Sequence, residues 1–145
     1  MDKVLSAHLE MEIPFYDVDP MGLVWHGNYV KYLEDARCAL MNKIGYSYIE
    51  MAASGYVWPI VHLKIKYIRP GRLCQKVAID VKLTEYKNCI KMEYVMTDVV
   101  NGTKMLKAET MQMAVDMETE ESCYASPQIL LDKLNAYWAA GGDDA

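Results

Sequence analysis

The sequence lacks an excess of basic residues and any long hydrophobic run. Fifteen Lys and Arg against twenty Asp and Glu leave a net charge of −5 over 145 residues, so no overall positive field attracts nucleic acid or an anionic membrane. No stretch reaches the ~18 apolar residues that a bilayer span needs, and the first residues lack the basic patch and apolar run of a signal peptide. We therefore expect a cytoplasmic chain with no nucleic-acid partner and no membrane insertion.

Cysteine and histidine are scarce and scattered. The four cysteines form no C-x-x-C pair, which argues against a zinc ribbon, a redox motif or a disulfide framework. The three histidines show neither the i, i+4 spacing of metal ligands nor an adjoining cysteine pair; they are His8, His26 and His62. The sequence predicts no metal site.

Length and composition indicate one domain that spans residues 1–145. Hydrophobic residues make up 52% of the chain and charged residues 24%, which is typical of a single globular core. We expect a core over about residues 5–120 and a C-terminal helix over about residues 126–140, with a frayed Gly-Gly-Asp-Asp-Ala tail.

Periodicity changes near the start of the chain. Apolar residues alternate with polar ones from Leu5 to Phe15, which predicts a half-buried strand. Turn-forming residues follow over 17–22, and apolar residues then recur at helical spacing between Asn28 and Gly45. Asn28 is a candidate N-cap and Gly45 a candidate C′ residue of one long helix.

The rest of the chain reads mainly as strands. Alternating segments at 61–67, 77–83, 90–96 and 111–117 predict four strands in a meander, with a hairpin at Asn101-Gly102. Ser126-Pro127 is expected to cap a short final helix. The fold class is therefore α+β: a five-stranded antiparallel sheet curled around one long helix. Apolar residues on the second face of the strands predict a homo-oligomer; they are Ile60, Ile68, Val95 and Val99.

Chemically capable groups are concentrated in residues 15–29, where the first strand joins the helix. If the helix begins near Asn28, the backbone N–H groups of His26 and Gly27 lie at its open, partially positive end. Such an end can stabilise a developing oxyanion. Asp19 lies on the loop leading there and is a candidate nucleophile or general base, while Asp17 is expected to stabilise the same loop.

The residues of this segment suit a thioester better than an amide or an alkyl ester. A thiol with a pKa near ~8.5 departs as thiolate without a strong general acid, so one carboxylate and one helix N-terminus are sufficient. An Asx-turn role for Asp19 stays open. Two alternative functions also stay open: a dehydratase or hydratase acting on 3-hydroxyacyl groups with Asp19 and His26, and a non-catalytic acyl-binding protein.

The pattern D-x-D-P-x-G-x-V-x-H-x-N-Y, from Asp17 to Tyr29, resembles the signature of the 4-hydroxybenzoyl-CoA thioesterase family, including its branch encoded beside Tol-Pal systems. Residues 67–72 resemble the family's Tyr-x-x-Pro-Ala-Arg segment, with Gly71 in place of Ala. The resemblance covers about residues 5–120 and implies a hotdog fold. Members of that branch have a tyrosine on the first strand, where this sequence has His8.

The resemblance implies hydrolysis of an acyl-CoA in a dimer or a tetramer of dimers, with sites between subunits and no metal or cofactor other than the coenzyme A of the substrate. By position, Asp19 is the catalytic carboxylate, the backbone N–H of His26 is the oxyanion donor, and the His26 side chain assists.

Five further residues are candidate substrate contacts. Trp25, Tyr29 and His62 are expected to line the acyl site, although Trp25 and Tyr29 also suit a wall or core position. Arg72 and Lys87 are expected to bind the phosphates of coenzyme A. The alternative for the strand lysines and their neighbours is that they deter edge pairing.

Overall fold

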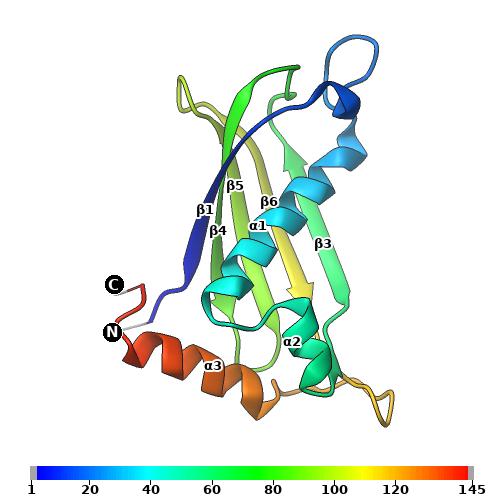
Figure 1. Cartoon of the computed structure of the whole chain (residues 1–145). Helices are drawn as coiled ribbons and strands as arrows, with labels where there is room; N and C mark the ends of the chain where they lie inside the picture. Colours follow the sequence, from blue (N-terminus) through cyan, green and yellow to red (C-terminus); the bar gives the residue numbers. More distant parts are fainter. Residues whose placement is uncertain (1–2, 144–145) are drawn as a thin grey trace.

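Five antiparallel strands form one sheet in the order β1-β4-β5-β6-β3 (Figure 1). The strands are β1 (Ser6–Glu12), β3 (Ile60–Tyr67), β4 (Lys76–Glu85), β5 (Ile90–Asp98) and β6 (Lys104–Gln112). The structure is a computed structural model and describes residues 3–143. The predicted fold class is confirmed: one sheet curls around one long helix.

The expected meander is wrong for β3. Only β4, β5 and β6 follow one another, whereas β3 pairs with β6 at the far edge of the sheet. The prediction also placed the last strand too late, because β6 ends at Gln112 and residues 115–116 belong to a separate two-stranded sheet, β2 (Tyr56–Val57) with β7 (Val115–Asp116). The inward face of β6 carries Thr110 and Gln112, which are buried polar residues. Because these two inward residues are polar, β6 does not show the alternation of apolar and polar residues that predicts a half-buried strand.

The central helix begins slightly earlier than predicted. A 3₁₀ turn, η2 (His26–Asn28), continues directly into α1 (Tyr29–Lys43). Asn28 does not cap the helix, because its backbone is already helical and its side-chain amide donates to the Asp17 carbonyl oxygen at 2.8 Å. Gly45 takes the predicted C′ position, with φ at +67°.

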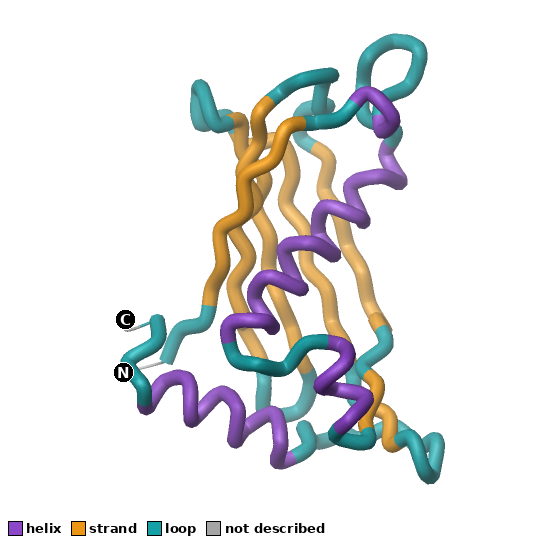
Figure 2. Tube along the Cα trace, in the orientation of Figure 1, coloured by secondary structure: helices purple, strands orange, loops and turns teal. Residues whose placement is uncertain are grey.

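Two shorter helices cover the end of the sheet at which α1 ends (Figure 2). The sequence analysis missed α2 (Tyr48–Ala53), although Ser47 and Glu50 form the capping box that starts it. The final helix, α3 (Gln128–Ala139), is confirmed, but Pro127 occupies its N-cap and no side chain caps it. The tail is held rather than frayed at Asp143, which accepts from the Ser6 amide and pairs with Lys43 at 2.8 Å.

The core lies between α1 and the inner face of the sheet. Leu33, Ala36 and Leu40 of α1 pack there against the apolar inner residues of β4 and β5. The outer face is mostly charged, with His8 bound to Asp80 at 2.6 Å across β1 and β4, so it does not carry the apolar surface expected around Val95.

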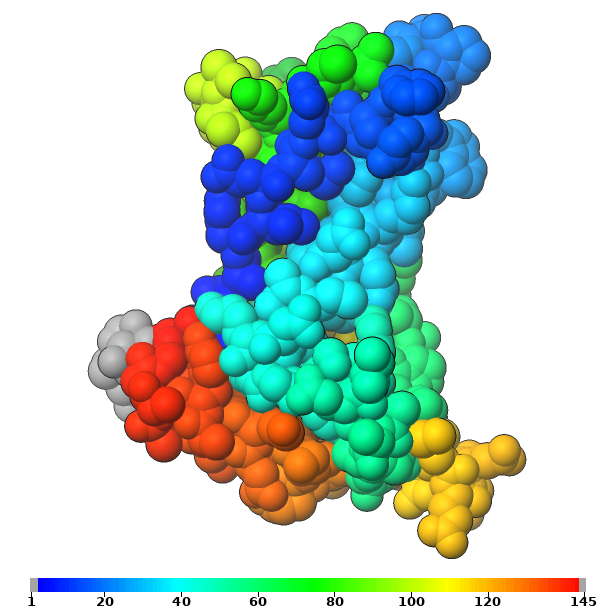
Figure 3. All heavy atoms as spheres, viewed as in Figure 1, coloured from blue at the N-terminus to red at the C-terminus, as the bar shows by residue number. Residues whose placement is uncertain are grey.

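Exposed apolar residues gather instead along β3. Every residue of this strand is exposed except the half-buried Ile65, and β3 has a neighbour on one side only. Figure 3 shows α1, α2 and α3 building one face of the molecule, with β3 emerging in green at its edge. The β3 strand is therefore an unpaired edge with exposed apolar side chains.

Candidate active site

The Asp-Pro-x-Gly motif folds as a small hairpin in front of the central helix. Val18 bridges Val24, and the Asp19 amide donates to the Leu23 carbonyl at 2.8 Å. Asp-Pro followed by glycine is typical of a β-turn with aspartate first and proline second, and the Gly22 amide closes that turn on the Asp19 carbonyl at 2.9 Å. The hairpin pairs Asp19 with Leu23, which lies three residues before the helix start at His26.

The turn orients the Asp19 carboxylate, but only one of its two oxygens is hydrogen-bonded. Its Oδ1 accepts from the amides of Met21 at 2.8 Å and Leu23 at 3.2 Å. For Oδ2 no hydrogen-bond partner occurs in residues 3–143, and the side chain is half-buried. The Asx-turn geometry and a free carboxylate oxygen therefore coexist at this residue.

Asp17 has a different environment. It is 3% exposed, and its carboxylate accepts from Lys31 and from the Tyr32 hydroxyl, the latter at 2.8 Å. Burial and then this bond raise the pKa of the Tyr32 hydroxyl, which stays protonated. Lys31 and Tyr32 were missed by the sequence analysis, because nothing in a helical pattern indicates which loop residue a helix side chain will meet.

Two backbone donors are free at the start of the helix. The Trp25 amide donates to Asp17 and the Asn28 amide to Trp25, but the amides of His26 and Gly27 find no acceptor within the described chain. The helix they open runs from residue 26 to 43, so its dipole adds positive potential at this point. These amides can stabilise a negatively charged oxygen.

The Trp25 ring covers the Gly27 backbone. A Cβ atom at Gly27 would lie 2.2 Å from that ring, so this position accepts glycine alone without a shift. Trp25 is 55% exposed, and its ring centroid lies 4.9 Å from that of His26. Both side chains thus flank the free amides from the solvent side.

A match to a known family accompanies this geometry. A model described as "Thioesterase-like superfamily" matches residues 13–132, which include the hairpin, the free amides and every strand of the main sheet except β1. The chain belongs to the thioesterase-like superfamily. The expectation of a thioester hydrolase is thereby confirmed at the level of the family. "Putative acyl-CoA thioesterase YneP" of Bacillus subtilis (strain 168) is 30% identical over 112 residues, covering 76% of this chain and 80% of that protein.

Solved structures share the fold of this thioesterase-like chain. The DHNA-CoA thioesterase from Staphylococcus aureus has a TM-score of 0.77 at 22% identity, covering 94% of this chain and 95% of that one. SAV2348 from the same organism, solved in complex with CoA, has a TM-score of 0.80 at 17% identity, covering 96% and 87%. At these identities the likeness shows the hotdog fold.

The loop after β3 holds the hairpin of this thioesterase-like chain in place. The Val24 amide donates to the Gly71 carbonyl at 2.9 Å, and Leu23 bridges Arg72. Gly71 fits closely at this position, since an added Cβ would lie 2.7 Å from the Ile13 side chain. Arg72 therefore lies beside the Asp19 hairpin.

The remaining predicted site residues lie elsewhere. Tyr29 is 4% exposed, and its hydroxyl accepts from the Gly71 amide at 2.8 Å, which gives it a wall position. His62 lies on the outer face of the sheet, 3.4 Å from Glu109, and so points away from α1. Lys87 lies in the turn between β4 and β5, separated from Arg72 by the ten residues of β4, roughly 33 Å of strand.

Within residues 3–143 no group of three or more His, Cys, Asp or Glu side chains is arranged to hold a metal ion. Among the described helices, none has both the length and the apolar composition to cross a bilayer.

Proposed function

We propose that this chain hydrolyses a small or medium acyl-CoA to the free acid and coenzyme A. The observation that carries the proposal is that one hairpin-to-helix segment contains both a carboxylate with a free oxygen, at Asp19, and two free amides, at His26 and Gly27. The family match and the similarity to YneP support a thioester substrate. No cofactor beyond the substrate's own coenzyme A is needed for this chemistry, and a cytoplasmic location remains part of the proposal.

The proposed mechanism uses these groups in turn. The thioester carbonyl oxygen accepts from the amides of His26 and Gly27, which stabilise it as it gains negative charge. Asp19 Oδ2 then attacks the carbonyl carbon or removes a proton from an attacking water. The C–S bond breaks, and coenzyme A leaves as a thiolate that takes a proton from solvent. The imidazole of His26, free within the described chain, assists at the same face.

The function is tested by Asp19→Asn. The amide oxygen of asparagine can still accept from Met21 and Leu23, so the turn and the fold are retained while the nucleophile or base is lost. We expect a loss of at least about 100-fold in kcat for thiol release, the scale of a lost general base. Asp132→Asn, on the exposed surface of α3, is the matched control and keeps full activity. Near-full activity of Asp19→Asn would exclude the assignment.

A single turnover in ¹⁸O-labelled water distinguishes the two roles of Asp19. Direct attack forms an anhydride, and water that then attacks its aspartyl carbon puts the label into Asp19 while the first acid released carries an Asp19 oxygen. Label in Asp19 therefore identifies direct attack. General-base catalysis places the label directly in the acid and leaves the aspartate unlabelled.

We also propose a homodimer formed by antiparallel pairing of two β3 edges, which two such dimers can extend to a tetramer. Unpaired N–H and C=O groups along an edge strand are a template for pairing, and exposed Leu63 and Tyr67 supply apolar area beside them. An isologous interface of this kind needs only one surface, present on both copies.

We propose contacts between individual residues and parts of the acyl-CoA substrate. Trp25 flanks the thioester, and Arg72 beside the Asp19 hairpin is the proposed contact to a phosphate of coenzyme A. Lys87 and Arg72 of one protomer cannot bind the same phosphate, because the length of β4 separates them. Membership of the 4-hydroxybenzoyl-CoA or Tol-Pal branch stays a proposal that rests on the motif from Asp17 to Tyr29.

A further inference from the structure

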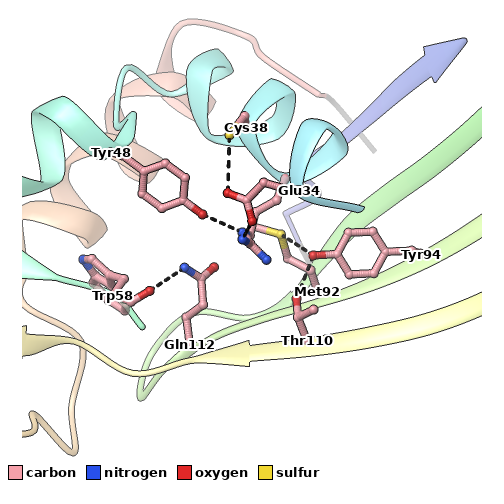
Figure 4. Close-up of polar contacts among 9 residues, drawn as sticks. Glu34, Cys38, Tyr48, Trp58, Met92, Tyr94, Thr110 and Gln112 are labelled. Atoms are coloured by element: carbon pink, nitrogen blue, oxygen red, sulfur yellow. Dashed lines mark hydrogen bonds and ion pairs between the residues drawn. The ribbon is translucent and has the colours of Figure 1, made fainter. Parts of the chain in front are cut away.

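Charge is balanced in the core of the molecule but not along the β3 edge. Arg37 is 5% exposed, forms an ion pair with Glu34, and donates from Nε to the Tyr48 hydroxyl at 2.9 Å (Figure 4). A charge in the core needs such partners, because burial without them is costly. On the surface, by contrast, two groups of charges without partners gather at the two ends of β3.

The Tyr67 end of β3 is basic. Lys66 lies directly opposite Lys107, and like charges in this position repel each other. The exposed cations at this end of the sheet edge, here called the basic end, are Lys66, Arg69, Arg72, Lys104 and Lys107. None of them forms an ion pair within residues 3–143. In a chain with a net charge of −5, this local positive field indicates an anionic partner.

Two arginines of the basic end line a hollow of about 200 Å³. Asp98 lines the same hollow, but both of its carboxylate oxygens already have donors. Oδ2 accepts from Gln75 at 2.6 Å, and Oδ1 accepts from two amides of its own turn. Neither Arg69 nor Arg72 has a carboxylate within ion-pair distance in the described chain. The hollow can therefore take a carboxylate that comes from another chain.

An acidic hairpin, residues 116–121, lies at the other end of β3. It follows Val115, which pairs with Val57 just before β3 begins, and the Asp116 amide closes it on the Glu121 carbonyl at 3.0 Å. Figure 3 shows this hairpin in yellow, projecting outward beyond the end of β3. Its three glutamates are exposed and form no ion pair in the part of the chain that the structure describes; they are Glu118, Glu120 and Glu121.

The proposed β3 dimer brings the two groups together. In an antiparallel pair with a two-fold axis, residues opposite each other lie on the same face, so one residue near the middle of β3 faces its own copy. A centre at Lys64 would set two lysines opposite each other, which is unfavourable. A centre at Leu63 sets two exposed leucines opposite each other. In that register Arg69, six positions after Leu63, is about level with the partner subunit's Val57, six positions before it.

We propose that the acidic hairpin of each subunit docks against the basic end of its partner. The contact occurs twice in the dimer, because a two-fold interface uses the same surface of both copies. Opposite charges at the two ends of one edge set the register, which is the main effect of charged groups at the rim of an interface. The inference rests on the proposed β3 dimer and uses none of the thioester chemistry.

The contact also lies beside the candidate active site. The loop that follows β3 carries the two arginines and holds the Asp19 hairpin, through the bridge between Leu23 and Arg72. Arg69 lies further along the sheet end, where its amide donates to the Met105 carbonyl at 3.0 Å. The acidic hairpin therefore docks at Lys66 and Arg69, and Arg72 stays beside the Asp19 hairpin.

The test reverses each group of charges and measures the dissociation constant of the dimer by sedimentation equilibrium. Glu118→Lys with Glu121→Lys reverses the hairpin, and Lys66→Glu with Arg69→Glu reverses the basic end. Each pair of substitutions sets like charges against each other in both contacts, so we expect either pair to raise the dissociation constant at least about tenfold.

A matched control changes the net charge without touching the contact. Glu12→Lys with Asp132→Lys makes the same change in net charge as the reversed hairpin, at exposed positions on β1 and α3. We expect this control to keep the wild-type dissociation constant.

Combining the two reversals should restore the dimer. A chain with all four substitutions again sets lysines against glutamates in both contacts, and we expect its dissociation constant to lie within about threefold of the wild-type value. An equimolar mixture of the two singly reversed chains should also dimerise, because opposite charges meet in both contacts of the mixed dimer. A defect in folding would not be repaired in either way.

The salt dependence of the wild type covers the case in which a reversed chain fails to fold by circular dichroism. High ionic strength screens exposed charges and should weaken the wild-type dimer at least about threefold. A dissociation constant unchanged by reversal, no recovery in the combined chain, or a dimer indifferent to salt would overturn the inference and leave the β3 dimer intact. A wild type that stays monomeric would overturn the dimer and the inference together, while thiol release from acyl-CoA tests the proposed function separately.

Discussion

Two aspartates of one motif, separated by a single residue, have opposite environments. Asp17 is buried and bound by Lys31 and Tyr32, whereas Asp19 is half-buried and keeps one carboxylate oxygen free. A bound, buried carboxylate contributes to stability, while an oxygen free to approach a carbonyl carbon contributes to chemistry. The sequence analysis assigned these two roles from the motif, but the partners of Asp17 come from a helix face and could not be inferred from spacing.

Asp17→Asn tests this division of roles. Asparagine has no charge to pair with Lys31 and presents an N–H₂ group toward one of two donors, so we expect the free energy of unfolding to fall by about 1–3 kcal/mol. Urea unfolding measures the loss, and thiol release measures activity on the same sample. Activity should fall less than in Asp19→Asn, which in turn should unfold like the wild type. The opposite pattern, a destabilised Asp19→Asn beside a stable Asp17→Asn, would contradict the division.

Among the secondary-structure elements, β1 adds a titratable side-chain contact to its backbone pairing with β4. His8 lies between Glu10 at 2.9 Å and Asp80 at 2.6 Å, on the outer face. The bonds to Glu10 and then Asp80 raise the pKa of His8 above 6.5. The stabilising charge is therefore complete below the unfolded-state value near 6.5 and is lost as pH rises through the folded-state pKa.

We expect an NMR titration of the His8 ring to give a midpoint above 6.5, and Asp80→Asn to lower it. Stability of the wild type should decline slightly with rising pH across the same interval, and the decline should shrink in Asp80→Asn. The effect is small because the His8 side chain is 52% exposed and water screens the pair. A His8 midpoint unaffected by Asp80→Asn would show that the pair does not persist in solution.

The elements differ in how well the sequence predicted them. Periodicity indicated α1 and β3 to β5 because their apolar residues repeat on one face. It failed for β6, whose inward Thr110 and Gln112 are polar, and for α2, which is too short to show a period. Of these two residues, Gln112 also lines a cavity between α1, α2 and the end of β6.

The arrangement of the whole molecule depends on a strand order that local patterns do not encode. A hairpin signal predicts neighbours, and β4, β5 and β6 follow that rule. The place of β3 at the far edge depends on the loop over residues 68–75, which is long enough to cross the end of the sheet and is held by the Asp19 hairpin. The consequence is an exposed apolar edge whose Tyr67 end lies beside the helix start.

Leu63→Asp tests whether that edge joins two copies. Leu63 lies near the middle of β3, opposite Thr110, and is 42% exposed. An aspartate there would be buried without a partner in each half of the interface, which costs several kcal/mol. We expect light scattering after size exclusion to give a dimer of twice 16.6 kDa for the wild type and a 16.6 kDa monomer for Leu63→Asp. Val100→Asp, at an 86% exposed hairpin position, is the matched control and stays dimeric. The family resemblance implies a site between subunits, so the monomer should lose most of its kcat/KM for thiol release, and a fully active monomer would exclude a shared site.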